Sequence, residues 1–403
     1  MKLNHLRPFL FLCLVVIFSS CSKNLKDEAD KIAQSTIILD GHVDIPYRLN
    51  NKMEDISQRT EGGDFDFVRA KKGGLNAPFM SIYIPAEKEE EGTAKKFADY
   101  LIDMVEKIAA DSPDKFAVAT SVADVHSQFE KGVISLPMGM ENGAPIEGDL
   151  KNVEYFYNRG IRYITLTHSK NNHICDSSYD SEKKWNGLSP FGKEVVKEMN
   201  RVGIMIDVSH ITDDTFYQVM EITQAPVIAS HSSCRAFTPG FMRNMDDEML
   251  KKLAENGGVI QINFGSSFLD GEIQKKYDEA FAASAEYAKE NNLNADDPKL
   301  DEFMSKYKEE HNIGFADITD IVKHIDHVVN LIGIDHVGIG SDFDGVGDSL
   351  PTGMKDVSMY PNLIHELLKK GYSREDIVKI CSGNVFRVWS EVEATAKRLQ
   401  TSS

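Results

Sequence analysis

Short segments rich in isoleucine and valine alternate with amphipathic segments along most of this chain of 403 residues. The apolar segments are bounded by Gly, Pro or Asn, a pattern typical of buried strands. The predicted strands cover residues 36–40, 77–84, 133–139, 161–167, 203–208, 226–230, 258–264 and 336–341. The amphipathic segments between most of them predict helices over residues 93–110, 150–159, 190–201, 213–222 and 245–256.

A strand followed by a helix, repeated about eight times, predicts a parallel sheet. If the eight units close on themselves, the chain forms an α/β fold of the (β/α)8 TIM-type barrel kind, at a typical size for that architecture. The alternative is an open, doubly wound sheet. In such a sheet the functional residues gather near one switch point instead of following nearly every strand.

The connection between the seventh and eighth predicted strands is unusually long and covers residues 266–316. It is rich in charged and helix-forming residues, so we expect a solvated helical insertion between strands 7 and 8. A lid over a functional site is the alternative interpretation.

The chain begins like an exported protein. Lys2 and Arg7 precede an apolar run over residues 9–18, and small residues then lead to Cys21. This order predicts an export signal, and the run is too short to span a bilayer. The tripeptide before Cys21 resembles a bacterial lipobox, whose cysteine becomes the lipid-bearing N-terminus; a signal peptide with a chance cysteine is the alternative.

A lipid on Cys21 would hold the protein at an extracytoplasmic membrane surface, on the periplasmic or the cell-surface face, while the folded domain stays in water. We therefore expect four parts along the chain. They are a lipoprotein signal peptide over residues 1–20, a spacer over 21–34, a single barrel domain over 35–391 and a polar tail over 392–403. The spacer is polar and helical in pattern, so a first helix is the alternative for it.

Charge and cysteine content exclude two classes of protein. The formal net charge of -18 argues against nucleic acid as a partner. Beyond Cys21 only Cys175, Cys234 and Cys381 follow, too few for a disulfide framework, although one pair could form in an oxidising compartment. The chain has no CxxC pair, which argues against a thiolate zinc site.

Histidines and acids stand at or just past the carboxyl ends of six predicted strands. In LDGHVDIP, His42 and Asp44 are two residues apart, so they point to the same side of an extended chain. A lone histidine after a strand is more often a packing residue, and Asp-Gly is more often a turn. Their joint placement at one barrel mouth nevertheless predicts a metal site. The full set is His42, Asp44, Glu141, His168, His210, His231, Asp342 and Asp344.

Imidazoles and carboxylates without cysteine suit zinc, with manganese, cobalt and iron as alternatives. Five candidate ligands exceed the three protein ligands usual for a single catalytic zinc. Two Zn2+ ions that share one bridging carboxylate fit the set better, and a water between two such ions is acidic enough to attack a carbonyl at neutral pH. The candidate ligands are His42, Asp44, Glu141, His210 and His231.

At these motifs the chain resembles the membrane (renal) dipeptidase family of zinc metallopeptidases, as a bacterial lipoprotein member. The resemblance runs from about Ile37 to Trp389 and rests on DGHVD, GMENG, YITLTH, DVSH, VIASHSS, RNMDD and HVGIGSDFDG in this order. It implies a (β/α)8 barrel, a dinuclear zinc centre and hydrolysis of free dipeptides by a metal-bridging hydroxide. Members of the family also accept a D-residue at the C-terminal position.

Carried over by motif, the resemblance implies metal-binding roles for five residues. His42 and Asp44 would bind one zinc ion. His210 and His231 would bind the other, and Glu141 would bridge the two.

The resemblance implies three further roles. His168 would hold the oxyanion, where a donor placed against developing negative charge is commonly the largest catalytic contribution. Asp342 would carry the proton to the leaving amine, and Arg243, in RNMDD, would hold the terminal carboxylate of the substrate. Ligand histidines usually need an orienting acceptor, and the candidates, which could equally be caps or turn residues, are Asp40, Asp207 and Asp344.

The chain departs from the family pattern at two positions. The bridging glutamate of the family often stands in Glu-Gly-Gly, whereas Glu141 is followed by Asn142. The family often has a tyrosine after the seventh strand, near Asn263 and Phe264, and here the next residue is Gly265. The first departure concerns only the shape of the loop and leaves the ligand intact. The second indicates either a different contact with the substrate or a different barrier over the pocket.

Two other functions are open on the sequence alone. A related barrel hydrolase could act on another amide, a lactam or a lactone, although Arg243 favours a substrate with a free carboxylate. A lipid-anchored binding protein without catalysis is the other alternative, and the presence of every candidate ligand together with Asp342 argues against it. The expected partners are dipeptide substrates and a membrane, with a homodimer as an open alternative.

Overall fold

The computed structural model describes residues 25–294 and 297–401 of the chain. Its main sheet has eight strands, and every neighbouring pair that is hydrogen-bonded is parallel. In sheet order the strands are β1 Ile38–Val43, β2 Leu75–Tyr83, β5 Met138–Glu141, β6 Ile161–Thr165, β7 Met205–Asp207, β8 Ile228–Ser232, β9 Val259–Ile262 and β10 Val337–Ile339.

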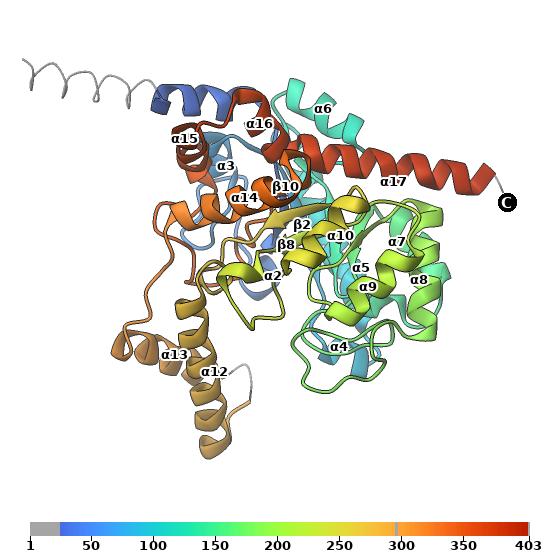
Figure 1. Cartoon of the computed structure of the whole chain (residues 1–403), viewed down its shortest axis with the longest axis vertical. Coiled ribbons are helices and arrows are strands. Elements are labelled where there is room, and N and C mark those ends of the chain that lie inside the picture. Colours follow the sequence, from blue (N-terminus) through green and yellow to red (C-terminus); the bar gives the residue numbers. More distant parts are fainter. Residues whose placement is uncertain (1–24, 295–296, 402–403) are drawn as a thin grey trace, which may run out of the picture.

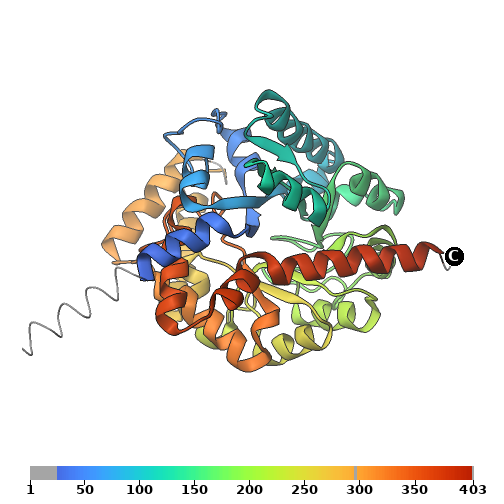
Figure 2. The same cartoon turned by 90° about the horizontal axis from the view of Figure 1, so that it is seen from above.

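The first and last strands of this sheet meet, so the sheet is a nearly closed barrel. Asp44 N–H donates to Phe343 O at 2.9 Å, and Asp342 N–H donates to His42 O at 3.0 Å. Figure 2 shows the helices arranged around the strands. The (β/α)8 prediction is confirmed and the open, doubly wound alternative is wrong.

The helices cover the outside of the barrel, and one of them, over residues 25–35, precedes β1. The helices between the strands are α2 Ile45–Asn51, α3 Phe67–Gly73, α4 Glu87–Glu90, α5 Ala94–Asp111, α6 Val122–Glu130, α7 Lys151–Asn158, α8 Pro190–Val202, α9 Asp213–Ile222, α10 Asp247–Glu255, α11 Ser266–Leu269, α12 Gly271–Asn291, α13 Pro298–Glu310 and α14 Ile318–Ile332. After β10 come α15 Tyr360–Lys370, α16 Arg374–Val378 and α17 Asn384–Thr401.

The local sequence explains where these elements begin and end. The barrel strands are buried along almost their whole length because helices cover one face and the barrel interior the other; β6, for example, is buried at all its positions. Helix α8 begins after Ser189, whose side chain accepts from Gly192 N–H, and Pro190 stands at its first turn. It ends at Gly203, whose φ of 95° is the left-handed conformation that favours glycine.

The third predicted strand, over residues 133–139, is two strands in the structure. Residues Ile134–Leu136 form β4, which pairs with β3 (Phe116–Val118) in a separate two-stranded sheet. The barrel strand β5 begins only at Met138. Pro137 lies between them and has no N–H to donate to a strand ladder, which explains the break.

Both ends of the described chain are helical. The segment over residues 21–34, expected as a spacer or a first helix, is helical from residue 25 and buries Ile32. The polar tail expected over 392–403 is instead the end of α17, with Val392 and Ala396 buried one helical turn apart. The signal peptide and Cys21 lie outside the described residues.

The expected insertion between β9 and β10 is helical, as predicted. Helices α12 and α13 pack against each other through the stacked rings of Tyr287 and Phe303, whose centroids are 4.5 Å apart. Figure 1 shows the pair projecting from the body of the barrel. In the part of the chain that the structure describes, Cys175, Cys234 and Cys381 are all free and buried, so no pair forms among them. Among these residues, no helix combines the length and the apolar character needed to cross a bilayer.

Candidate metal centre

The strand ends of the barrel bring the predicted ligands together at one mouth. His42 lies in β1, Glu141 is the last residue of β5 and His231 lies in β8. His210 lies three residues after the end of β7, and Asp44 directly follows β1. All five side chains are at least nine-tenths buried. The carboxyl ends of parallel barrel strands meet on one face, which is why residues nearly 190 positions apart in sequence become neighbours.

Glu141 lies at the centre of this group. Its Oε2 is 3.2 Å from His42 Nε2. Its Oε1 is 3.0 Å from His210 Nε2 and 3.2 Å from His231 Nε2. On the β1 side, His42 Nε2 is 3.5 Å from Asp44 Oδ2. One carboxylate oxygen therefore faces each of the two predicted ligand pairs, as a bridging ligand requires.

These spacings fit a metal-binding set. Ligand atoms about 2.0–2.1 Å from a tetrahedral zinc lie about 3.3 Å from one another, and the nitrogen–oxygen distances around Glu141 are close to this value. His42 Nε2 is buried and has no hydrogen-bond partner among the described residues. Such an atom is costly to bury unless a ligand satisfies it. Groups of three candidate ligand atoms lie within 4.8 Å of one another in the sets His42–Glu141–His231, Glu141–His168–His210 and His42–Asp44–Asp342.

The protonation states of Glu141, His210 and His231 suit a cation. Burial lowers the pKa of His210 and of His231 well below the ordinary value, so both imidazoles are neutral. Burial alone would raise the pKa of Glu141, but the nearby imidazoles of His42 and His168 hold it well below its usual range. His42 differs: burial alone would lower its pKa, but Tyr163, Glu141 and Asp44 raise it well above the ordinary value, so this imidazole must give up a proton when a metal binds.

Two of the histidines have their other ring nitrogen held by a hydrogen bond. His42 Nδ1 lies 2.8 Å from the hydroxyl of Tyr163 in β6. His231 Nδ1 lies 2.7 Å from Ser230 Oγ, and Ser230 Oγ donates to Asp207 Oδ2 at 2.6 Å. If Nε2 of each histidine binds a metal, Nδ1 carries the proton and donates to these oxygens.

Of the three acids predicted to orient ligand histidines, only one does so. Asp207 supports His231 through Ser230. Asp40 instead accepts from Ser341 N–H at 2.8 Å and from the Tyr360 hydroxyl, so it joins β1 to the β10 end of the barrel. Asp344 holds no histidine and belongs to a separate polar cluster. Reasoning from the sequence missed Tyr163 and Ser230. Only their places within YITLTH and VIASHSS could have suggested them.

Asp342 lies against the β1 side of the centre. Asn263 Nδ2 donates to its Oδ2 at 2.8 Å. Burial and the neighbouring Asp44 raise the pKa of Asp342 to about 7. A carboxyl group with this pKa can accept and release a proton near neutral pH.

His168 and Arg243 flank the centre. His168 Nε2 is 3.6 Å from Glu141 Oε1, beyond hydrogen-bond distance, and burial lowers the pKa of this histidine. The buried guanidinium of Arg243 donates to Ser232 Oγ at 2.6 Å and to His231 O at 2.7 Å. These bonds use two of its five N–H donors. The structure thus brings both residues to the mouth where the sequence predicts them.

An aromatic ring lies against Arg243. Its guanidinium lies 5.4 Å from the centroid of the Phe268 ring, and Phe268 contacts Phe241 edge-on at 5.3 Å. Gly265, where the family often has a tyrosine, packs against Phe268: a Cβ atom there would lie 3.0 Å from Phe268 Cδ2. Phe268, from the start of the insertion, therefore occupies the space beside Gly265.

Comparisons with known proteins agree with this site. The profile of the membrane dipeptidases, peptidase family M19, matches residues 26–403. The dipeptidase aclJ of Aspergillus oryzae is 36% identical over 344 residues, which cover 84% of this chain and 72% of that protein.

Solved structures with the same fold include the probable dipeptidase PvdM of Pseudomonas aeruginosa, with a TM-score of 0.80 and 27% identity over 93% of this chain and 100% of that one. A metallopeptidase of Rhodobacter sphaeroides, bound to a phosphinate mimic of the dipeptide L-Ala-D-Ala, has a TM-score of 0.72 and 25% identity over 89% of this chain and 100% of that one.

Proposed function

Because the chain belongs to the membrane dipeptidase family, peptidase family M19, and is therefore a metallo-dipeptidase, we propose that it uses two zinc ions to hydrolyse free dipeptides. His42 and Asp44 would hold one ion, His210 and His231 the other, and Glu141 both. The observation that carries this proposal is the placement of Glu141, whose two oxygens face the two ligand pairs at 3.0–3.2 Å. Bound there, zinc would acidify a water molecule and polarise the substrate carbonyl.

Arg243 would bind the free carboxylate of the dipeptide. Its guanidinium is held by Ser232 and by the backbone of His231, so it is fixed before the substrate arrives. Its Nε–H is buried and has no partner among the described residues. A fixed guanidinium with donors to spare suits a planar carboxylate. This contact would select substrates in which the carboxylate follows the scissile bond by one residue.

Two side chains would serve the reacting atoms. His168, kept neutral by burial, can donate an N–H to the oxygen that becomes negative when the peptide carbonyl is attacked. Asp342, with a pKa of about 7, can take a proton from the attacking water and pass it to the leaving amine. The hydrogen bond from Asn263 fixes one oxygen of Asp342 and leaves the other free for this transfer.

We also propose that the substrates include dipeptides with a D-residue at the C-terminal position. The ligand of the Rhodobacter sphaeroides relative, a mimic of L-Ala-D-Ala, supports this extension. A panel of L-L, L-D, acyl-blocked and C-terminally amidated dipeptides, with tripeptides as controls, tests it. We expect turnover of the free L-L and L-D dipeptides only. Cleavage of the amidated dipeptides or tripeptides as fast as the free ones would refute the role of Arg243.

For location, we propose a lipid anchor on Cys21 at an extracytoplasmic membrane face, supported by the lipobox-like sequence alone. Replacement of Cys21 by Ala should release the protein from membranes on fractionation; unchanged membrane association would refute the anchor. Light scattering of the mature chain tests the homodimer alternative, for which a monomeric mass is the contrary result.

A further inference from the structure

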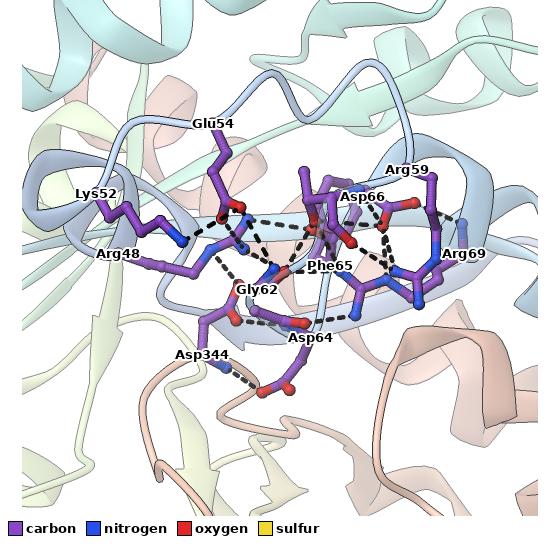
Figure 3. A network of polar contacts seen from close by, with 12 residues as sticks. Arg48, Lys52, Glu54, Arg59, Gly62, Asp64, Phe65, Asp66, Arg69 and Asp344 are labelled. Atoms are coloured by element: carbon purple, nitrogen blue, oxygen red, sulfur yellow. Dashed lines mark hydrogen bonds and ion pairs between the residues drawn. The ribbon is translucent and has the colours of Figure 1, made fainter.

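Asp344, two residues after Asp342, is tied to a distant segment by reciprocal hydrogen bonds, drawn in Figure 3. Asp64 N–H donates to Asp344 Oδ1 at 2.6 Å, and Asp344 N–H donates to Asp64 Oδ2 at 2.9 Å. The two residues are 280 positions apart in the sequence. The side chain of Asp344 is only 1% exposed. A buried carboxylate used in this way connects the β10 loop firmly to the segment before α3.

Arg48 extends this contact to α2. Its Nε lies 3.2 Å from Asp344 Oδ2, and its guanidinium donates to Gly62 O at 2.9 Å and Phe65 O at 3.1 Å. Arg48 is the middle residue of α2, and its N–H donates to Asp44 O at 3.1 Å. One side chain therefore joins the helix that follows Asp44, the segment before α3 and the loop that carries Asp342 (Figure 3).

The loop held by these contacts has an uncommon backbone. Asp342 has φ 63° and Asp344 has φ 65°, both in the left-handed region. Aspartate tolerates this region better than most residues, but such conformations persist only where the surroundings fix them. The reciprocal hydrogen bonds with Asp64 fix the backbone of Asp344 in this conformation.

Gly345 shows how the loop acts on the metal centre. A Cβ atom at Gly345 would lie 2.1 Å from Asp44 Oδ2 and 2.2 Å from Asp342 Oδ1. The backbone at Gly345 thus lies directly against both carboxylates. Any displacement of its neighbour Asp344 would move this backbone and change the position of Asp342.

We propose that Arg48, Asp64 and Asp344, here called the Asp344 clamp, are positioning residues that set the place of the Asp342 carboxylate for proton transfer. The clamp touches no substrate and contributes through the backbone of residues 342–345. The inference rests on the proposed role of Asp342. A displacement of about 1 Å in such a group can reduce turnover about 100-fold.

Steady-state kinetics of Asp344→Asn test the clamp. Asparagine tolerates the same φ and keeps an oxygen to accept from Asp64 N–H, but it removes the carboxylate that faces Arg48. We expect kcat to fall about 10- to 100-fold while KM and the zinc content stay within twofold of the wild type. Asp64→Ala removes the other half of the reciprocal pair and should have the same effect.

Arg59→Gln is the matched control. Arg59 belongs to the same network through its ion pair with Asp66, 2.9 Å long, but its side chain is 56% exposed and contacts neither Arg48 nor Asp344. Its kcat should equal that of the wild type. Thermal unfolding of every variant, with kinetics measured well below the transition, separates a loss of kcat from a loss of folded protein.

The outcomes distinguish the clamp from the proposed function. Wild-type kcat in both Asp344→Asn and Asp64→Ala, beside an inactive Asp342→Asn, would overturn the clamp alone. Wild-type kcat in Asp342→Asn would overturn the role of Asp342 itself. Zinc lost in step with activity in the clamp variants would also overturn the inference, because it would assign the clamp to metal retention.

Discussion

The hydroxyl of Tyr163 offers a sharp test of how the metal centre is supported. Replacement of Tyr163 by Phe removes one oxygen atom, which lies 2.8 Å from His42 Nδ1. The ring itself should not move, because it is fully buried and packs closely on its neighbours. A Cβ atom at Gly139 would lie only 2.0 Å from Tyr163 Cζ. The variant therefore changes the support of one ligand and leaves the ligand set intact.

The size of the effect follows from the role of this hydrogen bond. Loss of the partner that orients a ligand histidine typically weakens metal binding 10- to 100-fold, or about 1.4–2.7 kcal/mol. A second effect should appear in the metal-free protein. His42 Nδ1–H would be buried without an acceptor, which costs about 1–3 kcal/mol of stability.

Competition with a chelator of known zinc affinity measures the first effect, and urea unfolding of the metal-free protein measures the second. Tyr372→Phe is the control, because its hydroxyl donates to Asp326 at 2.8 Å in a contact outside the site. That variant should bind zinc as the wild type does. Wild-type zinc affinity in Tyr163→Phe would refute the reasoning that His42 binds the metal through Nε2 and needs this partner.

Three further predictions can be checked directly. Gly345→Ala should reduce kcat more than about 100-fold, because the added Cβ would strike the carboxylates of Asp44 and Asp342. This bound is the cost of misplacing a catalytic group by about 1 Å. Wild-type kinetics would contradict the prediction. Arg243→Lys should raise KM for free dipeptides about tenfold or more, since a lysine cannot offer a bidentate fork, and an unchanged KM would contradict it. Burial lowers the pKa of His324 from 6.5 to about 4 in the folded protein. Below pH 6.5 the unfolded chain therefore binds a proton at His324 that the folded chain does not, and up to about 3 kcal/mol of stability is lost as the pH falls toward 4. Urea unfolding at pH 7 and pH 4.5 should show a smaller loss in His324→Asn than in the wild type, and an equal loss would contradict the prediction.

The meeting of the candidate ligands at one mouth could be predicted from the sequence because each lies at or just past the end of a recognisable strand. An apolar run that ends in His or Glu marks a strand end in a parallel barrel, and strand ends converge whatever the exact register. For this reason the strand positions alone were enough to predict that His42, Glu141 and His231 lie close together. The (β/α)8 architecture was predictable on the same grounds, from about eight strand–helix repeats.

The supporting residues were not predictable in this way. Tyr163 lies inside β6 and contacts His42, 121 positions earlier, across the barrel interior. Strand periodicity says which face a residue occupies, but not which distant ring it meets. The partner of Asp344 could not be predicted either, because Asp64 stands in a loop without a regular pattern. Asp40 was an equally plausible support for a histidine, but it joins β1 to the β10 end of the barrel instead.

Anomalous diffraction at the zinc edge, on crystals of the zinc-loaded protein, tests the two-ion centre most directly. We predict two peaks per chain, one between His42 and Asp44 and the other between His210 and His231, with Glu141 in contact with both. A single peak, or two peaks of which one lies away from Glu141, would contradict the two-ion centre that we propose for this dipeptidase.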